Sequence, residues 1–257
     1  MPAPKRRHKS HFSLPADVRA GLPTDHEAVT QSRTLFPSTV VRAADAPRLL
    51  VSGENQRKIG DKVMKGRWRG MPIFCLTLEE RATCPTHCGH WRSCYGNGMP
   101  LARRHQHGPE LEALLPVELA AKQAQFPGGF VVRLHLLGDF YDTAYAALWL
   151  RWMRIFPALR IFGYTARRPD SLIGEMVQAM NAHPGRRCLI RFSGYQGDDV
   201  PAARTIERDP GEPRTADGIV CPVQTDRVSC CATCALCWST DAPIAFIIHG
   251  RIGADNG

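Results

Sequence analysis

The chain has 257 residues, of which 44% are hydrophobic and 22% are charged, and this ordinary globular composition excludes a wholly disordered, collagenous or coiled-coil protein. No stretch approaches the ~18 apolar residues of a membrane-spanning helix, and the basic residues at positions 5–9 precede no hydrophobic segment, so we expect a cytoplasmic protein without membrane contact. The net charge of +9 favours encounter with nucleic acid or another polyanion. The oligomeric state is left open.

Two basic segments open the chain. Residues 1–48 are rich in proline, serine and arginine and lack hydrophobic periodicity, which predicts a flexible extension ahead of one α/β domain at residues 49–257. The second segment interleaves Trp68 with six cations: Arg57, Lys58, Lys62, Lys65, Arg67 and Arg69. That pattern suits phosphate contact with base stacking in a nucleic-acid site, and it equally suits a charged surface loop whose tryptophan packs inward.

From residue 71 onward, short apolar runs typical of buried strands alternate with helical patterns. The runs cover residues 73–78, 130–137, 159–164, 188–192, 218–221 and 244–248, and the helical patterns cover residues 110–125, 142–156 and 171–182. This alternation predicts right-handed βαβ units, and six strands predict either a partial (βα)6 barrel of the TIM type or an open parallel sheet. Both architectures place their working groups at the carboxyl ends of the strands.

Ten cysteines are distributed unevenly along the chain. Seven of them form two sets that follow predicted strands, and we name these the first cysteine set (Cys84, Cys88 and Cys94) and the second cysteine set (Cys221, Cys231, Cys234 and Cys237). In a chain without an export signal, such bunching indicates metal ligation rather than disulfides. Both sets are expected in loops at the carboxyl-end rim of the sheet. Cys75 and Cys188 lie within predicted strands and are expected to pack in the core.

The second cysteine set has the spacing of an iron–sulfur site. Three thiolates in Cys231-x2-Cys234-x2-Cys237 can surround three corners of a [4Fe–4S] cube, and Cys221, which precedes a proline, matches the remote ligand of bacterial ferredoxins. Zinc is the alternative metal, although four-cysteine zinc sites usually draw two ligands from each of two segments. Cys230 would replace Cys231 as a ligand if Cys231 faced away.

The first cysteine set has spacings x3 and x5 and resembles the cluster loop of radical S-adenosylmethionine enzymes, whose usual spacings are x3 and x2. In those enzymes three thiolates hold a [4Fe–4S] cluster, and the open iron binds S-adenosylmethionine. His87 and His90 lie among these cysteines and offer a fourth ligand. Gly138-Asp139, after the second predicted strand, is similar to the Gly-Glu element that holds the cofactor's amino group in the same enzymes.

Further polar residues are expected at the same rim. Arg133 and His135 alternate with leucines and should point to one face of the sheet, where a buried arginine needs an anionic partner such as Asp139 or a ligand. The candidate catalytic residues are Asp139, Arg133, His135, Tyr164, Arg167 and His249, and the candidate cofactor-binding residues are Gly138, Asp139 and Tyr95.

Five segments together resemble the gene-product-88-like proteins of bacteriophages and prophages: residues 76–85, 94–97, 133–140, 164–167 and 231–238. The resemblance implies a phage or mobile-element setting and no particular reaction. From the residues we expect an iron–sulfur protein with one or two [4Fe–4S] clusters, acting as a radical-S-adenosylmethionine-like or other redox enzyme. The alternative is a non-catalytic zinc-binding module that binds nucleic acid through the basic residues at positions 57–69.

Overall fold

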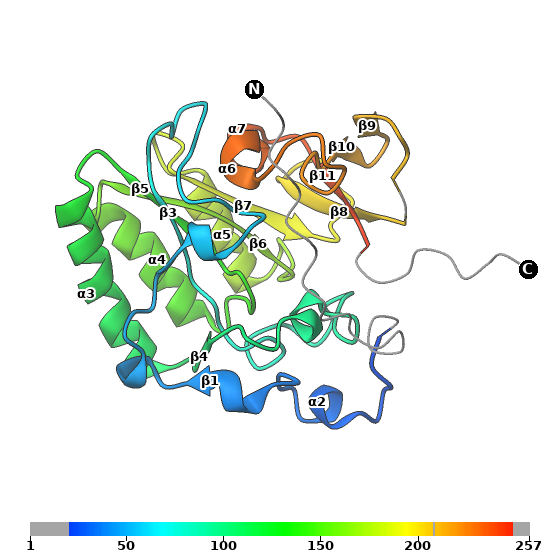
Figure 1. Ribbon diagram of the computed structural model, residues 1–257, viewed down its shortest axis with the longest axis horizontal. Helices are drawn as coiled ribbons and strands as arrows, with labels where there is room; N and C mark the ends of the chain where they lie inside the picture. The colour runs from blue at the N-terminus through cyan, green and yellow to red at the C-terminus, as the bar shows by residue number, and fades with distance from the viewer. Residues whose placement is uncertain (1–20, 208, 249–257) are drawn as a thin grey trace, which may run out of the picture.

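The computed structural model describes residues 21–207 and 209–248. These residues form a nine-stranded, mostly parallel sheet with the order β2-β3-β5-β6-β7-β8-β11-β10-β9 (Figure 1). In chain order the strands are β2 (Val51–Ser52), β3 (Ile73–Cys75), β5 (Phe130–Leu134), β6 (Leu159–Thr165), β7 (Cys188–Ser193), β8 (Ala202–Ile206), β9 (Arg214–Thr215), β10 (Gly218–Val220) and β11 (Ile244–Ile247). The predicted class, an α/β protein with a parallel sheet, is confirmed.

The sheet advances in one direction and stays open. The strands from β3 to β8 lie side by side in chain order, and all neighbours pair in parallel except the edge strands β2 and β9. Within the described part of the chain, β2 and β9 each pair with a single neighbour, so the sheet does not close into a barrel. Of the two predicted architectures, the open sheet is the one observed.

Three helices cover one face of the sheet: α3 (Pro109–Gln125), α4 (Thr143–Ile155) and α5 (Leu172–Asn181) (Figure 1). Right-handed crossovers between strands that advance in one direction place each connecting helix on the same side. The helix α4 begins at Asp142, whose side chain accepts a hydrogen bond from the backbone N of Tyr145. Among the described residues, no helix is both long and apolar enough to span a membrane.

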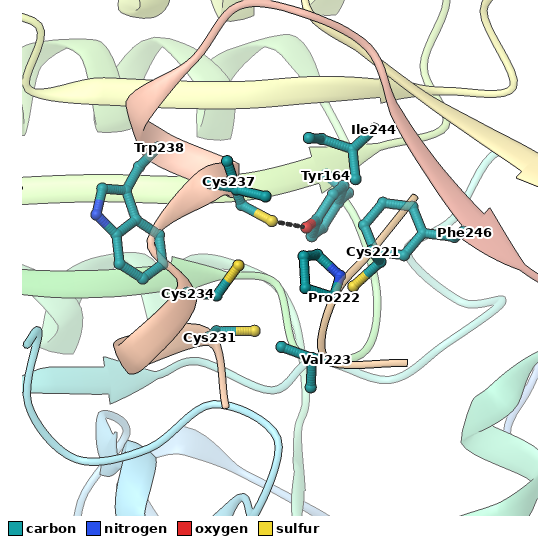
Figure 2. Close-up of a pocket in the computed structure, with 11 residues that line it drawn as sticks. Tyr164, Cys221, Pro222, Val223, Cys231, Cys234, Cys237, Trp238, Ile244 and Phe246 are labelled. Atoms are coloured by element: carbon teal, nitrogen blue, oxygen red, sulfur yellow. Dashed lines mark hydrogen bonds between the residues drawn. The ribbon is translucent and has the colours of Figure 1, made fainter. Parts of the chain in front are cut away.

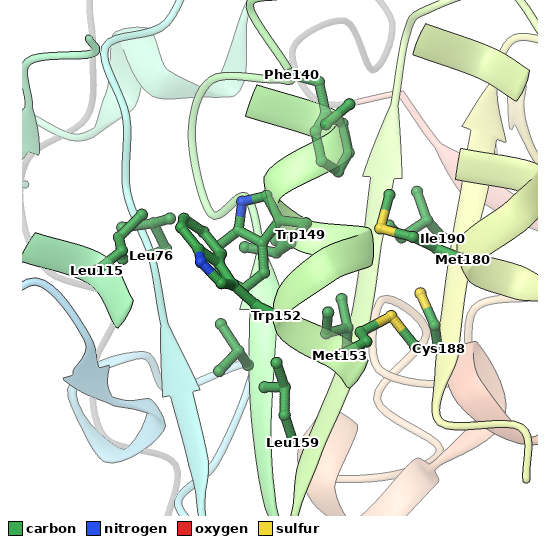
Figure 3. Packing of buried hydrophobic residues seen from close by; sticks show 14 of the residues in the cluster. Leu76, Leu115, Phe140, Trp149, Trp152, Met153, Leu159, Met180, Cys188 and Ile190 are labelled. Atoms are coloured by element: carbon green, nitrogen blue, oxygen red, sulfur yellow. The ribbon is translucent and has the colours of Figure 1, made fainter. Parts of the chain in front are cut away.

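The core beneath these helices is built largely around α4. Trp149 and Trp152 of α4 are buried, and their rings meet edge to face with centroids 4.9 Å apart (Figure 3). Cys188 of β7 is buried in the same cluster and packs as a small apolar side chain. The strands contribute Phe74, Val132, Ile161 and Ile190 to this face.

The opposite face of the sheet is concave. Tyr164 of β6 and Phe246 of β11 have ring centroids 5.4 Å apart, although β7 and β8 lie between their strands. In a flat sheet, three strand spacings would separate them by roughly 14 Å, so the sheet curves around this face. The concave face is covered by residues 59–68 and by two short helices, α6 (Cys231–Cys234) and α7 (Leu236–Ser239).

Residues 21–48, part of the segment expected to be a flexible extension, pack against the domain. They contain α2 (Glu27–Thr30) and β1 (Val40–Val41), and β1 pairs in parallel with β4 (Arg104–His105). Leu22 and Ala28 are buried. Residues 1–20 of that segment lie outside the described residues.

Candidate metal centre

The second cysteine set surrounds one cavity. Its four cysteines all line a small, largely enclosed space of about 20 Å³ on the concave face of the sheet (Figure 2). The rest of the wall is mostly apolar and consists of Tyr164, Pro222, Val223, Leu236, Trp238, Ile244 and Phe246. The cysteines grouped by their spacing in the sequence therefore lie around a single space.

The local chain path brings these thiols together. Cys221 follows β10 directly, and its backbone N donates to the carbonyl of Ala245 on β11 at 2.9 Å, which fixes it against the sheet. Cys231 and Cys234 are three residues apart on α6 and so share one side of it. Ala235, with a φ of 63°, separates α6 from α7 and redirects the chain before Cys237.

Cys230, the alternative ligand to Cys231, is not among the residues that line the cavity. Its Sγ lies 3.1 Å from Oγ1 of Thr233 instead. The backbone N of Cys231 donates to the carbonyl of Lys58 at 2.8 Å, and this bond fixes the start of α6 with Cys231 on the cavity side.

Burial governs the protonation of the cavity thiols. Cys221, Cys234 and Cys237 are buried, and Cys231 is half-buried. Burial raises the pKa of Cys221 to about 11, and negative charge on Cys237 or Cys234 would raise that pKa further. Burial likewise raises the pKa of Cys231, on which the other three thiols act electrostatically. Several of these thiols can ionise together only when a bound cation compensates their charge.

Tyr164 contacts the cysteines directly. Its hydroxyl donates to Sγ of Cys237 at 2.8 Å (Figure 2). Burial and the neighbouring Cys237 raise the pKa of Tyr164 well above its ordinary value, so the hydroxyl keeps its proton. Tyr164 is therefore a hydrogen-bond donor to the sulfur of Cys237.

Arg133 is a buried cation beside the cavity. It is 7% exposed, and its guanidinium lies 4.5 Å from the ring centroid of Tyr164 and 5.5 Å from that of Phe162. Its Nη1 donates to the carbonyls of the next two residues at 2.7 and 2.9 Å. In the described residues no carboxylate pairs with Arg133, so the pairing with Asp139 considered from the sequence is not formed. An anion at this place would offset the cost of the buried charge.

His135 does not share the face of Arg133, and this expectation was wrong. The strand β5 ends at Leu134, so the alternation of side chains stops before His135. Its Nε2 lies 3.0 Å from the hydroxyl of Tyr145 on the helix-covered side, and burial lowers the pKa of His135 to about 3. The imidazole is thus a neutral core group. The other histidine among the candidate catalytic residues, His249, lies outside the described residues.

The loop of the first cysteine set crosses the carboxyl ends of the parallel strands. Nε2 of His87 lies 3.1 Å from the carbonyl oxygen of Ala166, just after β6, and Nε2 of His90 lies 3.5 Å from Oγ1 of Thr205 on β8. All three cysteines of the set are half-buried, and burial raises the pKa of Cys94 to about 11. These contacts leave both histidines at the rim of the sheet.

Gly138 and Asp139 hold this loop against the sheet. Gly138 has a φ of +81°, and a Cβ there would lie 2.5 Å from Oγ1 of Thr83, so only glycine fits this close approach. The backbone N of Asp139 donates to the same Thr83 hydroxyl at 3.1 Å. Its carboxylate accepts from the Thr165 hydroxyl and the backbone N of Ala166, both at 2.7 Å. Burial raises the pKa of Asp139 to about 6, and these bonds oppose the rise.

Arg167 also holds the loop of the first cysteine set in place, through hydrogen bonds to backbone carbonyls. Its Nε donates to the carbonyl of Phe140 at 2.8 Å and its Nη2 to the carbonyl of Thr83 at 2.9 Å. Asp139 and Arg167, both candidates for catalysis, therefore position the loop of the first cysteine set through bonds within the protein. Tyr95 differs from them: the residue is 46% exposed, while burial of its phenol raises its pKa and Arg133 and Cys94 act on it electrostatically.

A buried ion pair that sequence reasoning missed supports the same loop. Nε of Arg104 lies 2.6 Å from Oε2 of Glu80, and their side chains are 0% and 1% exposed. Arg104 also donates to the carbonyls of Gly96, Met99 and Ala102, which belong to the segment after Cys94. The sequence signal for this pair is weak: a charged cluster stands between a buried strand and Cys84, but nothing in it points to Arg104.

The basic segment packs against the second cysteine set. Trp68 is 1% exposed and stacks on Trp238 of α7 with ring centroids 5.8 Å apart and planes inclined by 8°. The six cations of the segment are all exposed. Of the two sequence interpretations of Trp68, the structure shows the inward-packed tryptophan.

The four thiols of the second cysteine set line one enclosed space. In residues 21–207 and 209–248, no three Cys, His, Asp or Glu side chains are grouped closely enough to hold a single metal ion. The two cysteine sets also occupy separate places, since the cavity of Figure 2 is lined by the second set and by none of the first.

No protein-family model, curated protein or solved structure matches the chain. The resemblance to the gene-product-88-like proteins therefore stays a prediction.

Proposed function

We propose that the second cysteine set binds an iron–sulfur cluster in the cavity of Figure 2. The observation that carries the proposal is the position of four cysteines, from two separate segments, around one largely enclosed and otherwise apolar space. Four thiolates are the usual ligands of such clusters. The cluster would supply one-electron chemistry, while the chain supplies the thiols, the hydroxyl donor of Tyr164 and the buried cation of Arg133.

The placement of the four cysteines around one space favours a cluster over zinc. The four sulfur ligands of one zinc ion lie about 3.8 Å apart, because each is about 2.3 Å from the ion in a tetrahedron. A cube of iron and sulfide instead receives each thiolate at a different corner, so its ligands surround a volume. Four thiols that come from two segments and line one enclosed space suit the second arrangement.

The activity we propose is that of a cytoplasmic redox enzyme from a phage or mobile element, similar to radical S-adenosylmethionine enzymes. In this proposal the first cysteine set holds a second cluster, at which S-adenosylmethionine binds. The support is positional, because its loop crosses the carboxyl ends of β6 and β8, where parallel-sheet enzymes keep their working groups. The backbone N of Asp139 and the side chain of Arg167, which both bond to Thr83 at the start of this loop, would position it, and Tyr95 would contact the bound molecule.

Purification without oxygen tests the proposal. We expect a brown protein that contains iron and acid-labile sulfide in equal amounts. A colourless protein with stoichiometric zinc would contradict the proposal and favour the zinc-binding nucleic-acid module. Incubating the reduced, loaded protein with S-adenosylmethionine tests the radical chemistry separately: an intact cofactor beside a reducible cluster would remove that part of the proposal and leave cluster binding standing.

Replacing Arg133 with methionine is expected to lower the reduction potential of the cluster by on the order of 50 mV, because a nearby cation stabilises the more negative reduced state. A redox titration followed by absorbance or electron paramagnetic resonance measures the shift. Arg133→Lys keeps the charge and should retain most of the wild-type potential. Equal potentials in wild type and Arg133→Met would show that this cation does not act on the cluster.

A further inference from the structure

Six exposed cations lie within one short segment whose backbone is bonded to α6 beside the candidate metal centre, and we name them the basic face. The face consists of Arg57, Lys58, Lys62, Lys65, Arg67 and Arg69, and Asp61 is the one carboxylate within residues 57–69. Six positive charges and one negative charge give +5, which is more than half of the chain's +9 within 13 residues. Such a concentration of one sign creates a local field that attracts polyanions.

The basic face is attached to the helix that carries two of the cavity cysteines. The backbone N of Cys231 donates to the carbonyl of Lys58, and that of Ala232 to the carbonyl of Ile59, both at 2.8 Å. The backbone N of Met64 donates back to the carbonyl of Ala232 at 3.0 Å. The stacked pair of Trp68 and Trp238 completes the attachment from the side of α7. The cations are thus presented by a segment whose backbone is held by α6.

We propose that the basic face binds the phosphate backbone of nucleic acid, and that this binding is coupled to occupancy of the cysteine cavity. Phosphates repeat along a nucleic-acid strand and can engage several cations at once. Trp68 is buried beneath the face, so no aromatic ring of this segment stacks on bases, and the binding is independent of base sequence. Only Met64 adds an exposed large apolar side chain here, which is too little to anchor the face in a lipid surface.

The coupling rests on the proposed function, because it requires that the cavity be filled. A cluster bound by Cys231 and Cys234 would fix α6, and the three backbone hydrogen bonds would pass that order to the basic face. Linkage makes the effect reciprocal, so bound nucleic acid must retain the cluster as strongly as the cluster favours nucleic-acid binding.

Fluorescence anisotropy with labelled duplex DNA, single-stranded DNA and RNA tests the binding step on the full, cluster-loaded chain. The triple variant Lys62→Gln, Lys65→Gln and Arg67→Gln should weaken binding at least about tenfold at low salt. For each phosphate that the variant no longer neutralises, the slope of log affinity against log salt should fall by about 0.9 on duplex DNA and by about 0.7 on a single strand. The three ligands distinguish DNA from RNA as the source of the phosphates.

A matched variant removes three exposed cations elsewhere: Arg103→Gln, Arg151→Gln and Arg154→Gln. It should keep nearly the wild-type affinity, although its net charge changes equally. Equal losses in the two triple variants would overturn the proposal, because they would reduce it to an effect of net charge. Retention on vesicles of anionic lipid that depends on Lys62, Lys65 and Arg67, with no retention of nucleic acid, would also overturn it.

The coupling is tested by the rate at which a chelator bleaches the cluster. Bound nucleic acid should slow the bleaching several-fold in the wild type and should have no effect in the triple variant of the basic face. Bleaching that nucleic acid leaves unchanged would overturn the coupling. A chain that binds nucleic acid through the basic face but never loads iron would contradict the proposed function and leave nucleic-acid binding standing. Failure of cluster binding and failure of nucleic-acid binding are therefore distinguishable.

Discussion

Replacing Cys231 with serine is expected to remove the iron and sulfide of the cavity cluster, which is about half of the total when both cysteine sets are loaded, whereas replacing the adjacent Cys230 with serine should leave all of it in place. Cys231 lines the cavity together with the other members of the second cysteine set, and Cys230 does not. Loss of one thiolate ligand leaves one corner of the cluster without the soft donor that it requires. Iron and sulfide per chain, together with the visible absorbance of the cluster, measure the effect.

The two variants form a matched pair, because the exchanged side chains are neighbours in sequence and the same atom is changed. Circular dichroism should show both variants folded. Full iron in Cys231→Ser with loss in Cys230→Ser would mean that the other cysteine is the ligand, and equal iron in both would contradict a cluster in this cavity. The same experiment with Cys221→Ser tests whether the remote segment contributes a ligand, since Cys221 reaches the cavity from β10.

The regular elements of this fold are well encoded in the local sequence. Buried parallel strands read as continuous apolar runs, and each of the runs at residues 73–78, 130–137, 159–164, 188–192, 218–221 and 244–248 overlaps a strand of the sheet. The helices α4 and α5 begin at side chains that accept from their first turns, Asp142 and Ser171, which the local sequence pattern can identify. These features depend on near neighbours in the chain, which is why they were predictable.

Where tertiary context decides the structure, the local sequence pattern is insufficient. The strand β8 was not predicted, since Arg204 and Thr205 interrupt its apolar character; Arg204 nonetheless lies in the sheet because carbonyls of residues 195–197 and the carboxylate of Asp198 surround its guanidinium. The predicted strand at 130–137 ends early, at Leu134. That early end reversed the expected side for His135, because a side-chain alternation holds only while the strand continues.

In the candidate site, too, the sequence identified the residues that are close together in the chain and missed the contacts between distant segments. Cysteine spacing identified the four residues that line the cavity, because ligands from one short segment must lie near one another. The partners that position the first cysteine set come from distant parts of the chain: Asp139 bonds to Thr165 and Ala166, and Arg104 pairs with Glu80. The sequence shows that Asp139 follows a strand. It does not show that both carboxylate oxygens of Asp139 accept hydrogen bonds from other parts of the protein.

Replacing Glu80 with glutamine is expected to destabilise the fold by about 3–5 kcal/mol, because it leaves the buried Arg104 charge without its counter-ion. The side chains of Glu80 and Arg104 are 1% and 0% exposed, and the arginine bonds to both carboxylate oxygens at 2.6 and 3.0 Å. The hydroxyl of Thr34 donates to the same carboxylate at 2.8 Å, so the change also disturbs the packing of residues 21–48. Urea unfolding followed by circular dichroism measures the free energy of unfolding.

The exposed pair of Arg42 and Glu110 provides the control. Its atoms are 2.5 Å apart, as close as those of the buried pair, but the two side chains are 62% and 38% exposed. Water already solvates both charges, so Glu110→Gln should change the unfolding free energy far less than Glu80→Gln. Similar small losses in both variants would contradict the view that burial of the Glu80–Arg104 pair is what holds the segment after Cys94. If Glu80→Gln also weakens cluster binding at the first cysteine set while the second set stays loaded, the pair supports that loop specifically.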